Sequence, residues 1–102
     1  TRRFFEYLAT NHGNRVGWAQ SYAVHYYCWN VAWHGPTYGT ATRYDLPQWI
    51  ALLCKARATE GILRGHRAVM DEFDPQRKVS LVMDEWGAWH EPHPGKAAWG
   101  LY

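Results

Sequence analysis

The sequence predicts an α/β fold, a fragment of a (β/α)8 TIM barrel that comprises about two βα units with parallel strands. Helical and extended stretches alternate along the 102 residues, both extended stretches are short and apolar, and a long loop follows each of them. Because two βα units do not close a barrel, residues 1–102 are expected to be a partial (β/α)8 domain and to contain no complete domain. An open doubly wound sheet is the alternative.

The first half of the chain predicts a helix, a strand and a loop. Residues 1–11 carry apolar residues at helical spacing and are followed by His and Gly, which typically end a helix. Residues 21–27 (SYAVHYY) are almost continuously apolar or aromatic, as in a strand that is covered on both faces. Residues 29–44 contain glycines and a proline and predict a long loop of the kind that often has a functional role.

A long helix is predicted in the second half. Asp45 is a suitable N-cap, Pro47 falls in the first turn, and apolar residues recur at helical spacing until Asp74. Gly61 and Gly65 lie inside this stretch and predict a bend or a break.

The second strand is predicted at residues 79–83 (VSLVM), directly before two acids, Asp84 and Glu85. A barrel presents catalytic groups at this end of a strand, and a retaining glycosidase needs a nucleophilic carboxylate about 5–5.5 Å from an acid/base carboxyl group. We therefore expect Glu85 to be a catalytic carboxylate; the alternative is a structural ion pair with an arginine such as Arg43. Asp84 would point the opposite way from Glu85 if the strand continued, and is expected to have a supporting role.

The first strand carries two further candidates, His25 and Tyr27, which share one of its faces. On a lumen face they could form hydrogen bonds with a nucleophile or with sugar hydroxyls. The alternative is a histidine and a tyrosine whose polar atoms are satisfied in the core. His66 falls within the helical stripe and is expected to be structural.

Composition and charge exclude several classes of function. The net charge is +2 and the basic residues are scattered, which argues against a nucleic-acid partner. No run approaches the roughly 18 apolar residues of a membrane span.

Cys28 and Cys54 predict two buried thiols in a reducing compartment, with a disulfide as the alternative. The aromatic share of 17% suits stacking on sugar rings as well as core packing.

Metal hydrolysis is a rival chemistry. The segment His90-Glu91-Pro92-His93 offers three potential ligands within four residues. Its spacing differs from H-E-x-x-H, and the proline argues against a helix that presents both histidines on one face.

Two motifs together resemble a known family. Asp84-Glu85-Trp86-Gly87-Ala88-Trp89 after an apolar strand resembles the nucleophile motif of the family 51 glycoside hydrolases, the α-L-arabinofuranosidases. Ala23-Val24-His25-Tyr26-Tyr27 resembles the preceding strand of that family. The two motifs occur in the family's order, about 55–60 residues apart, and the resemblance covers nearly the whole chain.

The resemblance implies a parent enzyme with a (β/α)8 catalytic barrel that releases terminal α-L-arabinofuranosyl residues from arabinan or arabinoxylan with retention. It implies that Glu85 is the nucleophile, that Tyr27 and His25 line the sugar subsite, and that Trp89 lies at its edge. It implies no metal or organic cofactor, an arabinose-containing oligosaccharide or polysaccharide as partner, and a homo-oligomeric parent. It also implies a cytoplasmic location, with secretion as the alternative.

The chain departs from the family pattern in two places. It lacks the Asn-Glu pair that carries the family's acid/base, so this residue is expected before Thr1, and the fragment alone is expected to be inactive. His90 stands where many relatives have a tyrosine. The alternative function is a non-catalytic carbohydrate-binding or interaction module that uses exposed tryptophans such as Trp86 and Trp89.

Overall fold

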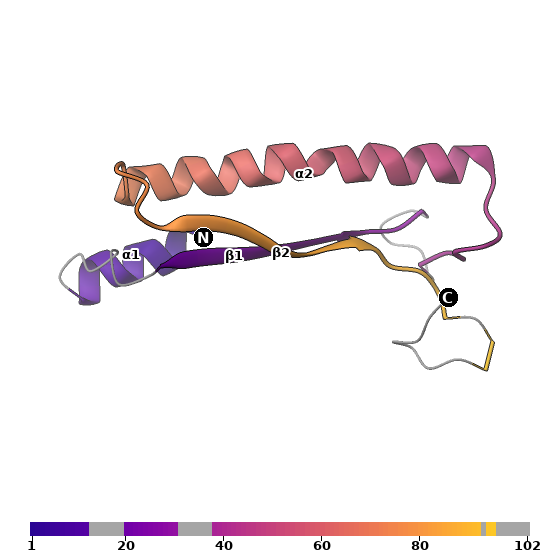
Figure 1. Cartoon of the computed structure of the whole chain (residues 1–102), viewed down its shortest axis with the longest axis horizontal. Coiled ribbons are helices and arrows are strands. Elements are labelled where there is room, and N and C mark those ends of the chain that lie inside the picture. The colour runs from indigo at the N-terminus through magenta and orange to yellow at the C-terminus, as the bar shows by residue number, and fades with distance from the viewer. Residues whose placement is uncertain (13–19, 31–37, 93, 96–102) are drawn as a thin grey trace. The chain divides into compact units, whose positions relative to one another are not determined.

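A computed structural model describes residues 1–12, 20–30, 38–92 and 94–95. Its elements follow the predicted order of helix, strand, helix and strand (Figure 1). They are α1 (Arg2–Asn11), β1 (Ser21–Cys28), α2 (Leu46–Phe73) and β2 (Ser80–Ala88). β1 and β2 form a two-stranded parallel sheet, so the predicted α/β fold with parallel strands is confirmed.

The chain divides into two compact units. Unit 1 consists of Thr1–His25 and Glu60–Asp84, and unit 2 of Tyr26–Thr59 and Glu85–Tyr102. The first contains α1 and the start of β2, whereas the second contains the start of α2 and the end of β2.

The core of unit 1 is formed by Phe5 from α1, Met70 from α2 and Val79 before β2, all completely buried. Phe5 also stacks on Phe73, with ring centroids 6.0 Å apart. Four partly buried residues complete the cluster: Leu8, Tyr22, Phe73 and Leu81. Burial of three large apolar side chains is the main stabilising contribution in this unit, at about 1.5–3 kcal/mol each.

The helix α2 begins where the sequence predicts. Asp45 Oδ1 accepts a hydrogen bond from the backbone N–H of Gln48 (2.8 Å), and Gln48 Oε1 accepts one from the N–H of Asp45 (2.9 Å). This reciprocal capping box satisfies two backbone donors at the start of the helix. The helix then continues without interruption through Gly61 and Gly65, so the predicted possibility of a break at these glycines is wrong.

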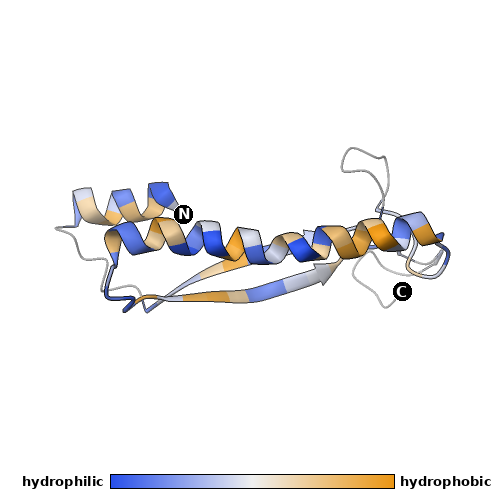
Figure 2. Ribbon diagram, turned by 90° about the horizontal axis from the view of Figure 1, so that it is seen from above, coloured by the Kyte–Doolittle hydropathy of each residue, from blue (hydrophilic) through white to orange (hydrophobic). Residues whose placement is uncertain are grey.

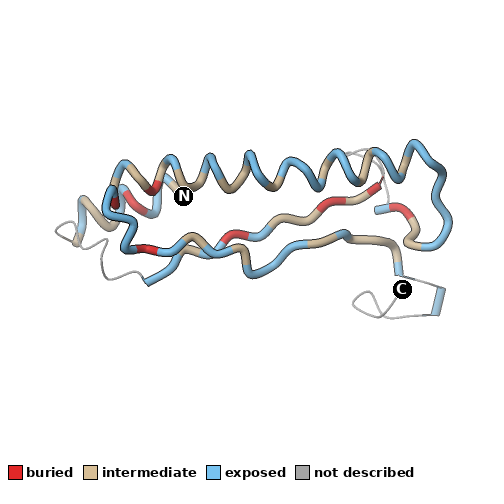
Figure 3. Tube along the Cα trace, turned by 45° about the horizontal axis from the view of Figure 1, so that its top comes forward, coloured by how far each residue is buried: buried red, intermediate tan, exposed pale blue. Residues whose placement is uncertain are grey.

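Most of α2 is only partly covered. Apolar and polar residues alternate along it (Figure 2), and exposed and half-buried positions alternate over almost its whole length, with Met70 as its buried residue (Figure 3). β1 is likewise less covered than predicted, because only Val24 and Cys28 are buried among its eight residues. Its apolar character is that of a strand covered on both faces, and the described residues cover it only in part.

The strand β2 is longer than predicted. It runs from Ser80 to Ala88, so Asp84 and Glu85 lie inside the strand rather than after its end at Met83. Charged residues are disfavoured in strands, which is why the sequence suggested an earlier end. The structure gives each acid a hydrogen-bonding or ion-pairing partner on β1, and the strand therefore continues past both.

The register of the two strands changes along the sheet. The N–H of Ser80 donates to the carbonyl of Gln20, and the N–H of Trp89 donates to that of Cys28. The acceptors are eight residues apart and the donors nine, so β2 carries one extra residue, which is the residue count of a β-bulge. Gly87 lies in this stretch at φ +146°, a conformation that favours glycine.

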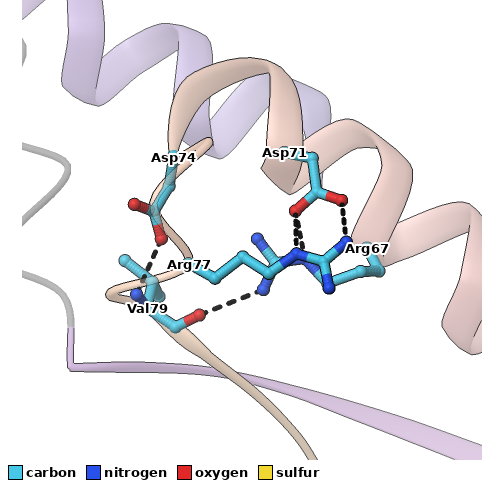
Figure 4. A network of polar contacts seen from close by, with 5 residues as sticks. All are labelled: Arg67, Asp71, Asp74, Arg77 and Val79. Carbon is cyan, nitrogen blue, oxygen red and sulfur yellow. Dashed lines mark hydrogen bonds and ion pairs between the residues drawn. The ribbon is translucent and has the colours of Figure 1, made fainter.

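A polar network in unit 1 fixes the start of β2 relative to the end of α2 (Figure 4). The carboxylate of Asp71 accepts hydrogen bonds from Arg67 (2.7 Å) and from Arg77 (3.1 and 2.9 Å). Arg67 also donates to the carbonyl of Val79 (3.1 Å), and Asp74 accepts the N–H of Val79 (2.7 Å). The backbone on both sides of Val79 is therefore held by side chains of the helix end and the turn that follows.

Two further predictions can be compared with the structure. Both cysteines are free thiols, but only Cys28 is buried, whereas Cys54 is exposed on α2, so the expectation of two buried thiols is wrong for Cys54. Among the described helices, none is both long enough and apolar enough to cross a membrane.

Candidate active site

The carboxylate of Glu85 is bound by a tyrosine from the neighbouring strand. Tyr27 Oη on β1 donates a hydrogen bond of 2.8 Å to Glu85 Oε2 on β2. A hydrogen bond to a charged acceptor is short and strong, and this one fixes the orientation of the carboxylate.

Aromatic rings extend from this pair in unit 2. The ring of Tyr27 lies 5.4 Å from that of Trp89, and the ring of Tyr38 lies 6.5 Å from that of Trp89. Tyr38 also makes an edge contact with Trp29, with centroids 5.5 Å apart. These tilted and edge-on pairs are favourable aromatic geometries. The four rings form a connected wall that begins at the partner of Glu85.

The base of this wall is held by α2. Lys55 Nζ donates to the carbonyl of Trp29 (2.7 Å) and lies 5.8 Å from the centre of its ring. Tyr26, the neighbour of Tyr27, donates through its hydroxyl to the carbonyl of Lys55 (2.8 Å). Successive residues of β1 thus point to opposite sides, one to the helix and the next to Glu85.

His25 and Asp84 form a second pair, in unit 1. His25 Nε2 lies 3.2 Å from Asp84 Oδ1, and both side chains are about half exposed. An imidazole held by a carboxylate has a fixed orientation and a defined tautomer. The half-exposed imidazole of His25 is thus oriented by the carboxylate of Asp84.

A pocket of about 140 Å³ opens in unit 2 between two loop segments. Gly39, at φ +77°, makes the turn that leads into it, and its carbonyl accepts the N–H of Glu91 (2.8 Å). Thr40 and Glu91 form a parallel bridge. The lining residues are Thr40, Ala41, Thr42, Arg43, Glu91, Pro92 and Pro94.

Burial changes the protonation of several groups. It lowers the pKa of His90, with a smaller opposing effect from a hydrogen bond to the backbone of Gly39, and this favours the neutral imidazole. Burial also lowers the pKa of His66, which contacts Thr1 and the ring of Tyr22, in agreement with a structural role. Burial raises the pKa of the Cys28 thiol, which makes it a poor nucleophile.

Among the described residues, no three His, Cys, Asp or Glu side chains gather as metal ligands would. His93, one of the proposed ligands, lies outside the described part of the chain.

The structure brings together three of the four predicted site residues in unit 2: Tyr27, Glu85 and Trp89. The fourth, His25, is paired with Asp84 in unit 1. Sequence reasoning missed Tyr38, Trp29 and Lys55. Their contacts depend on the conformation of a loop and on the far side of a helix, and the only available signal was an excess of aromatic residues in the loop after β1.

Known proteins that are similar to this chain include two arabinofuranosidases. No protein-family model matches the chain. Over 90 residues the chain is 33% identical to an intracellular exo-α-L-arabinofuranosidase from Bacteroides ovatus, an alignment that covers 87% of the chain and 17% of that relative. The crystal structure of the GH51 arabinofuranosidase from Xanthomonas axonopodis pv. citri matches 90% of the chain and 19% of its own, with a TM-score of 0.73 and 33% identity.

The α/β fold with parallel strands is consistent with a segment of the TIM-barrel catalytic domain of a glycoside hydrolase. More specifically, most of the chain is similar to a segment of family 51 arabinofuranosidases, so the resemblance seen in the sequence is confirmed. It spans less than a fifth of the length of each of these relatives.

Proposed function

We propose that residues 1–102 are part of the (β/α)8 catalytic domain of an α-L-arabinofuranosidase, in which Glu85 is the nucleophile. The observation that carries this proposal is the 2.8 Å hydrogen bond from Tyr27 to Glu85, next to the ring of Trp89. A carboxylate held in one orientation beside an aromatic wall is suited to attack a sugar that stacks on that wall. The parent enzyme acts on terminal α-L-arabinofuranosyl groups of arabinan- or arabinoxylan-type substrates.

The reaction proceeds with retention in two steps. The carboxylate of Glu85 attacks the anomeric carbon while the glycosidic bond breaks, which gives a covalent arabinosyl-enzyme. Water then attacks the same carbon, the ester bond breaks and the carboxylate is released. The donated hydrogen bond from Tyr27 holds the carboxylate in line during both steps, and Trp89 borders the sugar ring.

The supporting groups have separate roles. His25, held by Asp84, is proposed to bind a sugar hydroxyl. The acid/base carboxyl group comes from outside residues 1–102, since the Asn-Glu pair expected for it does not occur in this chain. The chemistry needs no cofactor, because two carboxyl groups supply the nucleophile and the proton. The cytoplasmic location and the homo-oligomeric state of the parent are proposed from the family resemblance and from the name of the Bacteroides relative.

Chemical rescue tests this proposal. In the parent protein, Glu85→Ala should lower kcat on an aryl α-L-arabinofuranoside by a factor on the order of 10⁴. Azide should restore turnover and give the β-arabinosyl azide, because the small anion enters the space of the missing carboxylate and attacks from its side. Glu60→Ala, which removes an exposed acid of α2, is the matched control and should leave kcat unchanged.

An active Glu85→Ala variant, or an inactive one that azide does not rescue, would contradict the nucleophile role. The non-catalytic alternative then gains weight, because Trp86 is 72% exposed and could stack on a sugar. In that case Trp86→Ala should weaken binding of arabino-oligosaccharides, and Glu85→Ala should leave it unchanged.

A further inference from the structure

Asn30, which lies two residues after the end of β1, is a buried polar residue that the proposed reaction does not use. It is only 3% exposed, and its Nδ2 donates a hydrogen bond of 3.3 Å to the backbone carbonyl of Thr40. Its Oδ1 has no hydrogen-bond partner in the described part of the chain. Burial of an amide is unfavourable unless hydrogen bonds compensate it, so the bond to Thr40 is the contribution that this side chain makes to unit 2.

The backbone next to Asn30 is fixed by α2. Lys55 Nζ donates to the carbonyl of Trp29 (2.7 Å), the residue directly before Asn30. The amide of Asn30 therefore extends from a part of the chain that is already tied to the helix. A group that is held in place before it makes a hydrogen bond loses less conformational entropy when the bond forms.

The acceptor of the Asn30 amide belongs to a segment that returns to the sheet after β1. Thr40 forms a parallel bridge with Glu91, and the carbonyl of Gly39 accepts the N–H of Glu91 (2.8 Å). Two residues earlier, the N–H of Trp89 donates to the carbonyl of Cys28, the last residue of β1. Alternate N–H groups after β2 thus donate first to β1 and then to residue 39, so residues 39–40 continue the parallel pairing beyond the end of β1.

This segment also carries one ring of the aromatic wall. Tyr38 directly precedes Gly39, and its ring contacts those of Trp29 (5.5 Å) and Trp89 (6.5 Å). Half of Tyr38 is exposed to solvent, so side-chain burial contributes little to holding its ring in place. The backbone hydrogen bonds of residues 39–40 therefore determine where this ring lies relative to Trp89.

We propose that Asn30 is a positioning residue for the sugar site, which acts by holding the carbonyl of Thr40. This hydrogen bond keeps Tyr38 against Trp89, so that the aromatic wall beside Glu85 has one conformation. The inference rests on the proposed function, because it takes the wall to be the surface on which the sugar stacks. Such a wall contacts the sugar ring in the ground state and in the transition state alike, so its loss should weaken substrate binding without slowing the chemical step.

A separation of KM from kcat tests the inference. In the parent enzyme, Asn30→Ala should raise KM for an aryl α-L-arabinofuranoside about three- to tenfold, the factor expected for one neutral hydrogen bond, and leave kcat within about twofold. Asn30→Asp preserves the shape of the side chain but removes the donor when the carboxyl group is ionised, so it should raise KM by at least the same factor. Thermal unfolding of both variants identifies the temperature below which their kinetics report on folded enzyme.

Asn11→Ala is the matched control, because Asn11 Nδ2 also donates to a backbone carbonyl, that of Tyr7 (3.2 Å), but does so on α1 in unit 1. It should leave KM and kcat unchanged. An unchanged KM in the two Asn30 variants, or a fall in kcat without a rise in KM, would overturn the positioning role while the proposed function stands.

Tyr38→Leu tests the same inference if neither Asn30 variant folds. It removes the ring that Asn30 is proposed to position and leaves the backbone bonds of residues 39–40 in place, so KM should rise and kcat should stay within about twofold. An unchanged KM in this variant would overturn the inference. A wild-type parent that does not cleave the arabinofuranoside would overturn the proposed function, and the positioning role with it.

Discussion

Two adjacent tyrosines on β1 perform different tasks, which makes them each other's control. Tyr27 donates to the carboxylate of Glu85, and Tyr26 donates to the backbone carbonyl of Lys55. Loss of a hydrogen bond to a charged group costs about 1.5–3 kcal/mol, and loss of a neutral one costs about 0.5–1.5 kcal/mol. Loss of the hydrogen bond from Tyr27 should slow the proposed reaction, whereas loss of the hydrogen bond from Tyr26 should destabilise the fold.

We therefore expect Tyr27→Phe to lower kcat/KM of the parent enzyme about 10- to 100-fold with little change in thermal stability, since a phenyl ring preserves the packing against Trp89. Tyr26→Phe should lower the free energy of unfolding by about 1 kcal/mol and leave kcat/KM unchanged. Steady-state kinetics and thermal unfolding of both variants check this. An equal kinetic loss in the two variants would contradict the assignment.

At the residue scale, the sequence predicted Glu85 and Tyr27 as site residues from their positions on the two expected strands, and the family resemblance added Trp89; contacts join the three in the structure. It could not identify Tyr38, whose contact with Trp89 requires the backbone of a loop. Nor could it choose between the lumen and the core for His25, because period-two alternation gives a shared face but not the surroundings of that face.

At the level of elements, the network after α2 determines where β2 begins. Val79 is completely buried, and its N–H is satisfied by Asp74, which is itself only 7% exposed. Asp74→Ala leaves this buried donor without its partner, and we expect the free energy of unfolding to fall by about 1–3 kcal/mol. Denaturant unfolding of the parent protein measures it. Glu60→Ala, which removes an exposed i,i+4 ion pair, should cost at most about 0.5 kcal/mol.

The same network predicts that the unfolding temperature falls at acidic pH. The hydrogen bond from Arg77 lowers the pKa of Asp71, with Arg67 contributing in the same direction. A carboxyl group whose pKa is lower in the folded state stabilises the fold above its unfolded pKa, and this stabilisation is lost as the pH falls through the folded value. Asp71→Asn should therefore lower the unfolding temperature near pH 7 and reduce its fall below pH 4. An unfolding temperature that falls equally below pH 4 in the variant and the wild type would contradict this.

The boundaries of elements show where local sequence information suffices. The start of α2 was predictable, because a capping box involves residues within four consecutive positions of the sequence. The end of β2 was not, since the strand continues past two acids whose partners, His25 and Tyr27, come from a distant part of the sequence. The extra residue of β2 could not be predicted from the sequence either, because it depends on pairing with a strand that is distant in the sequence.

At the scale of the whole molecule, large apolar side chains remain exposed over the first turns of α2. Leu46, Trp49, Ile50 and Leu53 are each more than 40% exposed. A contiguous apolar patch of this kind favours association in water. The expected barrel neighbours would cover this surface in the parent enzyme, and the α/β pattern predicted such neighbours although it could not place them.

The 102-residue chain expressed alone is thus expected to be insoluble or to self-associate. It is also expected to have no measurable arabinofuranosidase activity, because the acid/base residue, which contributes about 10²–10⁴-fold, is proposed to lie outside it. Size-exclusion chromatography and a fluorogenic arabinofuranoside assay check both points. A monomer that unfolds cooperatively would contradict the first expectation, and turnover that depends on Glu85 would contradict the second.

The repeated tyrosine of β1 also has a consequence for insertions. A one-residue shift of a strand exchanges its two faces and normally replaces every side chain on each. Here the shift that removes Tyr27 from Glu85 brings Tyr26 into its position, so a phenol hydroxyl still faces the carboxylate. Such a shift loses the tether to α2 at Lys55, and it also places Val24 where His25 is paired with Asp84. A one-residue duplication that shifts this strand should therefore keep a phenol at Glu85 while it weakens the anchoring of the helix and removes the partner of Asp84.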